Sequence, residues 1–261
     1  MEISFIIPNY HSEKYLEKCL ASIERNVSNI NHEIIIVNND ASEIDLSFEN
    51  SSVHILNTFS NLGFSKACNL GAKIAKGKIL FFLNPDTEIM DAKLLEFLFL
   101  LNKKEVGIIA PSLVLTSGQL QPWSGGENIS PLSTIFQNIF HKNFAPFPKK
   151  DAIVSLAWVS GAALLIRKNL FEKVGGFDEN FFMYFEDVDL CKRMRKLGKK
   201  VLLLSQPNVL HYGGSSINNN KTQKQFYYTS QDYYFEKHFG QVQAKLIKFI
   251  RKLFILIKTS F

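Results

Sequence analysis

The chain has 261 residues, of which 46% are hydrophobic and 21% charged, and its formal net charge is +6. These ordinary globular values exclude a chain that is disordered throughout, and the length allows one large α/β domain or two small ones. The three cysteines lack CxxC or metal-ligand spacing, so we expect reduced thiols in a cytosolic protein, and Met1 to Ser4 carry no basic region of a signal peptide.

Strand and helix patterns alternate through the N-terminal half. Short apolar runs typical of buried strands alternate with segments whose apolar residues recur at helical spacing. The predicted strands are at 4–8, 33–37, 53–56 and 78–83, and the predicted helices are around 15–23 and 64–75. This order predicts an α/β fold with a mixed, mostly parallel sheet flanked by helices, in which ligands bind beyond the carboxyl ends of the strands.

Polar clusters follow the predicted strands at those ends. They are Pro8-Asn9-Tyr10, Asn38-Asn39-Asp40 and Asn84-Pro85-Asp86. Because the ends of parallel strands meet at one edge of the sheet, one crevice would gather all three clusters. The chain has no GxGxxG or Walker A sequence, so an ordinary dinucleotide or P-loop site is not expected.

The second half of the chain begins with a predicted helix at 93–103 and a strand at 106–115. A long loop follows at 119–150, with a short helix around 132–140. Its aromatic residues favour contact with a ligand or lipid, as in a loop that covers an active site, although a variable surface insertion is the alternative. These aromatics are Trp123, Phe136, Phe140, Phe144 and Phe147. Apolar segments at 157–166, 201–204 and 209–211 complete the domain.

The stretch from Gly175 to Arg195 is the strongest candidate for chemistry. It places three carboxylates in Glu186-Asp187-Val188-Asp189, directly behind an aromatic run from Phe181 to Phe185. Burial among aromatic rings raises the pKa of a carboxylate toward a range useful for acid–base chemistry. The alternative is an acidic N-terminus of a helix that continues over 190–197.

Asp86 and His211 are candidate ligands of a divalent cation. A carboxylate oxygen together with an imidazole nitrogen suits Mn²⁺ better than a set of oxygens alone would. Each residue also has an ordinary alternative, since Asp86 could serve a turn or a helix cap and His211 could be a structural histidine.

The C-terminal segment 243–261 interleaves basic with apolar residues. Its charges interrupt it too often for a bilayer span, whereas the pattern suits a basic amphipathic helix at a membrane surface. A helix that covers the domain, or one that pairs with a second subunit, remains the alternative. The basic residues are Lys245, Lys248, Arg251, Lys252 and Lys258.

Short motifs along the chain form a recognisable series. They are Pro8-Asn9-Tyr10, Asn61-Leu62-Gly63-Phe64, Asn69-Leu70-Gly71, Leu83-Asn84-Pro85-Asp86-Thr87, Trp158-Val159-Ser160-Gly161-Ala162, Gly176-Phe177-Asp178-Glu179 and Glu186-Asp187-Val188-Asp189-Leu190. In this order the sequence resembles the family 2 glycosyltransferases of GT-A fold, and within them the bacterial rhamnosyltransferase-like branch. The resemblance implies a GT-A domain over 1–215 and leaves 216–261 as a helical, basic and amphipathic extension.

The resemblance also implies residue roles at the reacting end of the site. Asn84-Pro85-Asp86 stands where the family has its DxD motif, so the metal would rest mainly on Asp86, with His211 as a second ligand. Asp187 stands where the family has its catalytic base, and Glu186 would orient the base or the acceptor.

The implied nucleotide and donor contacts lie at the strand ends and on the helix at 64–75. Asn38 and Asn39 depart from the family, which often has Asp at one of these positions. The donor-binding set is Pro8, Tyr10, Asn38, Asn39, Asp40, Asn61, Gly63, Phe64, Lys66, Asn69, Asn84 and Asp86. Lys66 would reach a phosphate, although an exposed helix lysine is the alternative.

The implied contacts to the sugar and the acceptor are Trp158, Gly161, Ala162 and Asp189. Gly161 and Ala162 would keep the floor beneath the sugar close and smooth, because a small side chain permits near approach. For Asp189, capping of the helix that follows is the alternative.

Together these features predict an inverting glycosyltransferase that depends on Mn²⁺ or Mg²⁺. The donor would be dTDP-L-rhamnose or a UDP-sugar, and the acceptor a glycan or lipid-linked saccharide of cell-surface polysaccharide synthesis. We expect a cytoplasmic protein held at the inner membrane surface through 243–261, with a homodimer as a further option. The alternative is a catalytically degenerate protein that binds sugar nucleotides or glycans. Nucleic-acid binding is not expected, because no recognition motif accompanies the basic residues.

Overall fold

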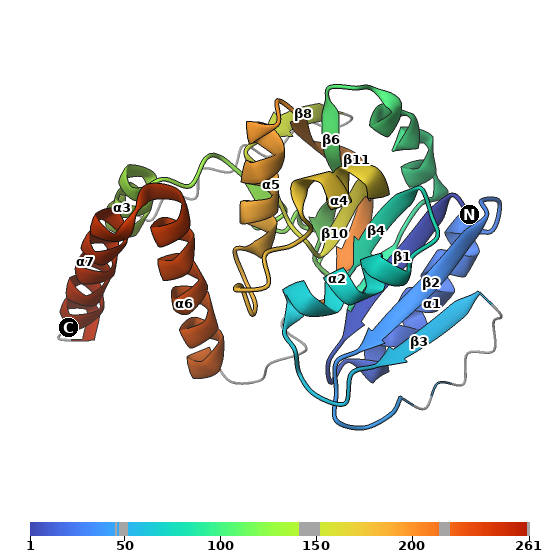
Figure 1. Cartoon of the computed structure of the whole chain (residues 1–261), viewed down its shortest axis with the longest axis horizontal. Helices are drawn as coiled ribbons and strands as arrows, with labels where there is room; N and C mark the ends of the chain where they lie inside the picture. Colours follow the sequence, from blue (N-terminus) through green and yellow to red (C-terminus); the bar gives the residue numbers. More distant parts are fainter. Residues whose placement is uncertain (45, 47–51, 141–151, 214–219, 260–261) are drawn as a thin grey trace.

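The computed structural model describes residues 1–44, 46, 52–140, 152–213 and 220–259. Among them, a nine-stranded mixed sheet has helices on both faces (Figure 1). The strand order is β3-β2-β1-β4-β10-β6-β11-β5, and β8 pairs with β11. Strands β1 to β4, β6 and β11 share one direction, whereas β10, β5 and β8 run against it. The predicted α/β class and mostly parallel sheet are confirmed.

The N-terminal half contains the elements that the sequence predicts. In chain order they are β1 (Ile3–Asn9), α1 (Glu13–Val27), β2 (His32–Asn38), β3 (Val53–Asn57), α2 (Phe64–Ile74) and β4 (Ile79–Leu83). The parallel register sets Asn9 beside Asn38, so the polar clusters after β1 and β2 do lie together.

The second half departs from the sequence prediction in several elements. The elements are β5 (Thr87–Ile89), the 3₁₀ helix η1 (Ala92–Asn102), β6 (Val106–Val114), β7 (Gly125–Gly126), α3 (Pro131–Phe140), β8 (Ile153–Leu156), β9 (Trp158–Val159), β10 (Ala163–Arg167), α4 (Lys168–Val174), α5 (Glu186–Lys196), β11 (Lys200–His211), α6 (Asn220–Phe239) and α7 (Gln241–Thr259). The apolar segment 157–166 breaks into β9 and β10. The two segments 201–204 and 209–211 belong to one strand, β11, whose register shifts between Leu204 and Asn208.

The long loop at 119–150 contains structure of its own. It includes β7, which pairs with β9, and the short helix α3. Trp123 is exposed, as a ligand- or lipid-contacting role would require. Phe144 and Phe147 lie in 141–151, outside the described residues.

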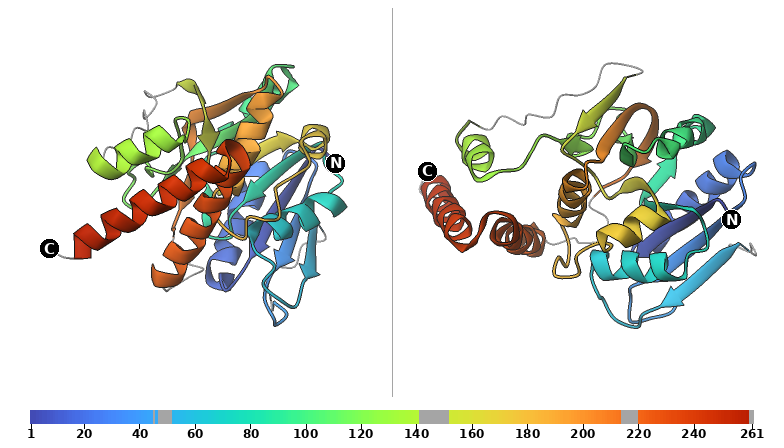
Figure 2. Two further views of the ribbon diagram at one scale, coloured as in Figure 1. Left: turned by 60° about the vertical axis from the view of Figure 1, so that its left-hand side comes forward. Right: turned by 45° about the horizontal axis from the view of Figure 1, so that its top comes forward.

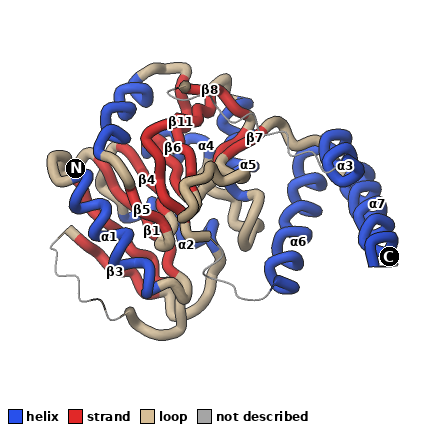
Figure 3. The backbone as a smooth tube through the Cα atoms, turned by 180° about the vertical axis from the view of Figure 1, so that it is seen from behind, coloured by secondary structure: helices blue, strands red, loops and turns tan. Residues whose placement is uncertain are grey.

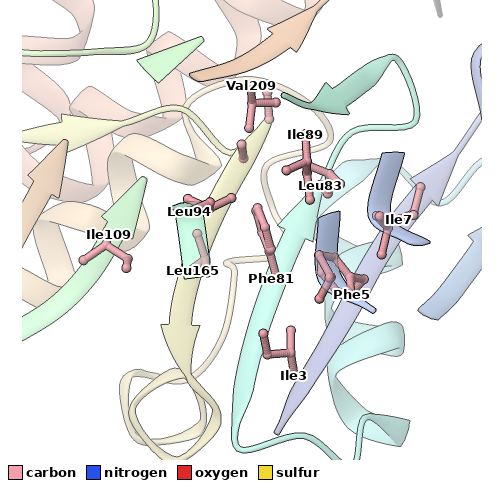
Figure 4. Close-up of a cluster of buried hydrophobic side chains, with 14 of the residues drawn as sticks. Ile3, Phe5, Ile7, Phe81, Leu83, Ile89, Leu94, Ile109, Leu165 and Val209 are labelled. Atoms are coloured by element: carbon pink, nitrogen blue, oxygen red, sulfur yellow. The ribbon is translucent and has the colours of Figure 1, made fainter. Parts of the chain in front are cut away.

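The core fills both faces of the sheet because side chains alternate along each buried strand. On one face, Ile3, Phe5 and Ile7 of β1 lie near Phe81 of β4 and Leu165 of β10 (Figure 4). Helices α1 and η1 cover this face. Figure 3 views the molecule from the side opposite to Figure 1, and there α1 lies in front of the sheet. On the other face, Ile6 and its neighbours pack under α2, α4 and α5.

The C-terminal helices α6 and α7 form a hairpin beside α5, with α3 against α7 (Figure 2). Phe181, Phe185 and Val188 share a buried cluster with Tyr234 of α6 and Ile247 of α7. The predicted boundary at 215–216 lies in the undescribed stretch 214–219. No helix in the described part of the chain is both long enough and apolar enough to cross a bilayer.

Arg251 does not lie on an exposed basic face of α7 as the amphipathic pattern predicts. Its guanidinium is buried and donates to Oε1 of Gln231 and Oδ1 of Asp232, each at 2.6 Å. An unpaired buried charge would be costly, and pairing with α6 avoids that cost. Arg251 therefore fastens the hairpin.

Gly63 joins the loop before α2 to the aromatic run. Its φ is +86° and its ψ 168°, a conformation that residues with a Cβ essentially avoid. A Cβ added at this position would lie 2.6 Å from the carbonyl oxygen of Phe182, to which the backbone N–H of Phe64 donates at 2.8 Å.

Gly63→Ala should lower the free energy of unfolding by about 3 kcal/mol, from backbone strain and overpacking together. Gly118→Ala is the matched control, because Gly118 also has a positive φ, +78°, but nothing lies within 4 Å of its added Cβ. It should lose about 1 kcal/mol. Urea unfolding at pH 7 measures both, and equal losses would contradict the role given to the Phe182 contact.

Candidate active site

Asp86 and His211 meet because β5 and β11 pair. The register sets Thr87 opposite His211, so Asp86 comes beside the imidazole ring. Oδ1 of Asp86 is 3.3 Å from Nε2 of His211, and both side chains are buried. The backbone N–H of Tyr212 donates to the carbonyl of Asp86 at 3.0 Å, which fixes the two segments together.

This pair fits a divalent cation. An oxygen and a nitrogen donor at this separation can bind one ion, and the combination suits Mn²⁺. Asn84, in place of the first acid of the motif, donates its backbone N–H to the carbonyl of Ala162 at 2.9 Å. Within the described ranges, no three His, Cys, Asp or Glu side chains gather at one point. The cation would therefore take its other ligands from substrate oxygens and water, as Mg²⁺ does in phosphate sites.

Asp187 lies in the first turn of α5, beside the segment that links β9 to β10. Its Oδ2 accepts from the backbone N–H of Gly161 at 2.9 Å, and its Oδ1 from that of Val188 at 2.7 Å. Burial raises the pKa of Asp187 above the usual range of a carboxyl, and these hydrogen bonds only partly offset the rise. Asp187 is thus fixed in place and made more basic.

Glu186, the first residue of α5, is buried beside Asp187. Burial raises its pKa well above the usual range, and the neighbouring charge of Asp187 raises it further. Its Oε2 has no hydrogen-bond partner among the described residues. A buried polar atom without a partner is unusual and marks a position where a ligand or water is expected to bind.

The residues just before this pair have a strained backbone. Tyr184 and Phe185 have φ values of +70° and +66°, although neither is glycine. Helix α6 holds them in place. Ser230 Oγ donates to the carbonyl of Met183 at 2.7 Å, and the rings of Tyr227 and Phe185 are 5.2 Å apart.

Nothing in the described structure supports the acceptor contact that the resemblance implies for Asp189, because both of its carboxylate oxygens are engaged within the protein. Its side chain is fully buried, with Oδ2 2.7 Å from Arg193 Nε and Oδ1 2.7 Å from both Lys237 Nζ and His238 Nε2. Burial opposes ionisation, but the bond from His238 and the charges of Arg193 and Lys237 lower the pKa of Asp189. With both oxygens occupied, Asp189 anchors α6 to α5, and no side-chain contact supports the alternative of a helix cap.

The two asparagines at the end of β2 make different hydrogen bonds. Asn39 accepts from the backbone N–H of Leu62 at 2.9 Å and donates to Oδ1 of Asn61 at 3.1 Å, so it braces the loop before α2. Asn38 donates to the carbonyl of Ser42 at 2.7 Å, and its Oδ1 is buried without a partner in the described structure. The oxygen of Asn38 thus remains available to a ligand.

Asp40, Tyr10 and Pro8 complete the expected nucleotide side of the site. Asp40 pairs with Nδ1 of His11 at 2.5 Å, and the rings of Tyr10 and His11 are 4.1 Å apart. Pro8 is buried next to the end of β1. His11 was not predicted, because a histidine in a loop carries no pattern of its own.

Two of the expected donor contacts, Lys66 and Asn69, lie on α2 in different surroundings. Lys66 is exposed on the helix. Asn69 instead braces the loop at 176–179, since it donates to the carbonyl of Phe177 at 2.9 Å and accepts from the N–H of Phe177 at 3.0 Å. Its amide is therefore used within the protein, and the donor role implied for Asn69 is not supported.

The residues implied for the sugar lie between Asp187 and Asn84. The backbone N–H of Gly161 donates to Asp187 and the carbonyl of Ala162 accepts from Asn84, so this short segment links Asp187 to the motif that contains Asp86. A Cβ on Gly161 would meet Asp187 and Phe64 at 3.5 Å, an ordinary contact distance. Trp158 is half-buried, and its indole lies over Gly126.

Solved structures that share this architecture are glycosyltransferases of GT-A fold. GalNAc-T7 with UDP, GalNAc and Mn²⁺ gives a TM-score of 0.62 at 15% identity, over 90% of this chain and 50% of its own. Mannosyltransferase PcManGT from Pyrobaculum calidifontis with GDP-Man and Mn²⁺ gives 0.59 at 14% identity, over 90% and 63%. At identities this low, the similarity is evidence for a shared fold alone.

The chain belongs to glycosyl transferase family 2, whose model matches residues 4–175. It is 26% identical to rhamnosyltransferase WbbL of Escherichia coli over 80% of this chain and 83% of that protein. It is 37% identical to an N-acetylglucosaminyl-diphospho-decaprenol L-rhamnosyltransferase of Mycobacterium tuberculosis, over 35% and 30%. Hexosyltransferase Agl10 of Haloferax volcanii matches at 25%, over 75% and 62%. The chain spans less than two thirds of the latter two relatives.

Asp189→Asn should lower the free energy of unfolding at pH 7 by about 3–5 kcal/mol, because it removes the buried carboxylate to which Arg193, Lys237 and His238 donate. Folding lowers the pKa of Asp189, so its contribution is complete above the unfolded value of about 4 and is lost as pH falls through the folded value. Urea unfolding at pH 7 and in acid measures this loss.

Glu172→Gln is the control for Asp189→Asn, since exposed Glu172 is 3.9 Å from Lys168. It should change stability by less than about 1 kcal/mol. A similar small change for Asp189→Asn would contradict the anchoring role.

Proposed function

We propose that the protein is an inverting, metal-dependent glycosyltransferase that uses dTDP-L-rhamnose or a UDP-sugar. The acceptor would be a glycan or lipid-linked saccharide of cell-surface polysaccharide synthesis. One observation carries the proposal: the segment 160–162 bonds Asp187 on one side and the motif with Asp86 on the other. The same short segment would thereby fix the positions of the base and of the cation site relative to each other. The names of the rhamnosyltransferase relatives support the donor.

Asp187 takes the proton of the acceptor hydroxyl as that oxygen attacks the anomeric carbon. The new carbon–oxygen bond forms as the bond to the nucleoside diphosphate breaks on the opposite face, which inverts the anomeric centre. Bonds from Gly161 and Val188 keep the carboxylate oriented during this step. Asp86 and His211 would hold the divalent ion, which supplies positive charge to the leaving diphosphate. Glu186 orients the acceptor or the base.

The nucleotide base would lie near the ends of β1 and β2. A uracil or thymine ring offers one N–H and two carbonyls, and the partnerless oxygen of Asn38 can accept that N–H. Asp40 and Tyr10 border the same side. Asn39, whose amide braces the neighbouring loop, contributes by shaping this pocket.

The second candidate is a degenerate protein that binds sugar nucleotides or glycans without turnover. The raised pKa of Asp187 favours the enzyme, because binding alone does not require a base.

A membrane surface is the proposed location of the reaction, on the cytoplasmic side. Val242, Leu246, Phe249 and Leu253 recur at helical spacing on α7 and are exposed, with Phe249 60% accessible. Exposed Lys245 and Lys252 border this stripe, a charge pattern complementary to anionic lipid. The stripe is smaller and less basic than the sequence predicts because Ile247 and Arg251 face α6.

Asp187→Asn should reduce sugar transfer by about 10²–10⁴-fold, the usual contribution of a positioned base. Wild-type activity should fall as pH drops below the raised pKa of Asp187, since the carboxylate must be ionised. Released nucleoside diphosphate measures transfer, with exposed Glu96→Gln as control.

Nucleotide binding distinguishes a loss of catalysis in Asp187→Asn from misfolding of the variant. Mn²⁺ with dTDP or UDP should still raise the Tm of Asp187→Asn, whereas Asp86→Asn should lose the Mn²⁺-dependent part of that rise. Near wild-type transfer by Asp187→Asn would refute the assignment of the base, and wild type that binds nucleotide but never turns over would favour the degenerate protein.

Phe249→Glu should weaken flotation with vesicles containing phosphatidylglycerol by about tenfold or more, because it removes an aromatic ring that would insert into the lipid and adds a charge that anionic lipid repels. Gln243→Glu places the same charge at an exposed polar position of α7 and should have a smaller effect. Unchanged flotation of Phe249→Glu would remove the membrane role. If instead it turned a dimer into a monomer on gel filtration, the stripe would be a subunit interface.

A further inference from the structure

Gln121 contacts the imidazole of His211 at the nitrogen that does not face Asp86. Its Oε1 is 2.7 Å from Nδ1, whereas Nε2 of the same ring faces Oδ1 of Asp86 at 3.3 Å. The ring is therefore held at both nitrogens by side chains from two different loops. Neither the glutamine nor this contact belongs to the site residues deduced from the sequence.

Backbone contacts fix the position of Gln121 without help from its side chain. Its N–H donates to the carbonyl of Leu113 at 2.8 Å, and its own carbonyl accepts from Ser124 Oγ at 2.9 Å. Leu120 pairs with Val114 as an isolated bridge. The loop therefore keeps its shape if the amide is replaced, and the side chain is left to act on His211.

The chemistry of the two groups sets the direction of the hydrogen bond. An amide oxygen only accepts, so Nδ1 of His211 carries the proton when the oxygen faces it. In the neutral ring, Nε2 then presents a lone pair toward a carboxylate oxygen that also only accepts. Two acceptors directed at each other across 3.3 Å repel unless a proton or a metal cation lies between them.

We propose that Gln121 is a positioning residue that fixes the Nδ1–H tautomer of His211 and so directs Nε2 and Asp86 toward one divalent cation. The inference rests on the metal role proposed for Asp86 and His211. Partners of this kind orient metal-binding histidines and raise their basicity, and their loss costs about 10–100-fold in metal affinity.

Three full-length variants test the inference. Gln121→Leu removes the acceptor, Gln121→Glu keeps an acceptor of similar length, and Gln119→Leu changes an exposed glutamine two residues away. The affinity for Mn²⁺, alone and with dTDP or UDP, is measured from the electron paramagnetic resonance of the free ion. Gln121→Leu should bind Mn²⁺ about 10–100-fold more weakly, while Gln121→Glu and Gln119→Leu should stay close to wild type.

The tautomer is read separately in metal-free protein from the ¹H–¹⁵N NMR spectrum of the imidazole rings. A His211→Asn variant identifies the His211 signals. We expect the proton on Nδ1 in wild type and in Gln121→Glu, and loss of this preference in Gln121→Leu. A merely structural role for Gln121 would change stability without producing this spectral difference.

The outcomes distinguish a wrong role for Gln121 from a wrong metal site. Wild-type Mn²⁺ affinity in Gln121→Leu, or a wild-type proton on Nε2, overturns the inference at Gln121 and leaves the metal site intact. A wild type that holds the Nδ1 tautomer yet binds no Mn²⁺, with or without nucleotide, overturns it through the proposed metal site itself.

Discussion

The ion pairs of Asp189 hold the catalytic segment to the rest of the molecule. A carboxylate with no exposed surface is strongly unfavourable unless its oxygens are paired, and two of its three partners, Lys237 and His238, lie on α6. The first turn of α5 can therefore occupy its place only when α6 is docked. The strained backbone at Tyr184 and Phe185 depends on the same docking, because α6 supplies the rings and the hydroxyl that hold it. The C-terminal helices are thus a structural part of the active site as well as a candidate membrane contact.

Local sequence patterns were sufficient for the long buried strands of the sheet and for one pair of candidate site residues. Buried strands such as β1 and β2 have continuous apolar runs, and their polar ends follow directly from strand direction. Asp86 and His211 were found through their chemistry and the family motif. Short strands such as β5 and β8 could not be found, because their pairing with β11 is a property of the folded sheet and leaves little periodicity in so few residues.

Partners far apart in the chain account for the remaining errors. Periodicity identified α7 as amphipathic but could not show that Arg251 turns toward Asp232, since the choice depends on how α6 packs. The sequence also could not show which partners Asn69 and Asn39 bond. An asparagine at either position could serve a ligand or another part of the protein. Hydrogen bonding separates them: their amides are used within the protein, whereas Asn38 and Glu186 each have a buried oxygen without a partner in the described structure. A ligand compensates best for polar atoms that folding has left unpaired.

The acidic cluster at the start of α5 divides into two kinds of carboxylate, although its members are two or three residues apart. Glu186 is buried and Asp187 half-buried, and desolvation outweighs the backbone hydrogen bonds to Asp187, so the pKa of each carboxyl is raised. Asp189 is buried with three cationic or donor partners, so its pKa is lowered and it stays ionised. Helical geometry separates Asp187 from Asp189, since residues two apart point to different sides of the helix. One side faces the segment at 160–162, and the other faces α6. Environments that separate the pKa values of neighbouring carboxylates separate their tasks as well, which supports the proposed proton transfer by Asp187 and the anchoring by Asp189.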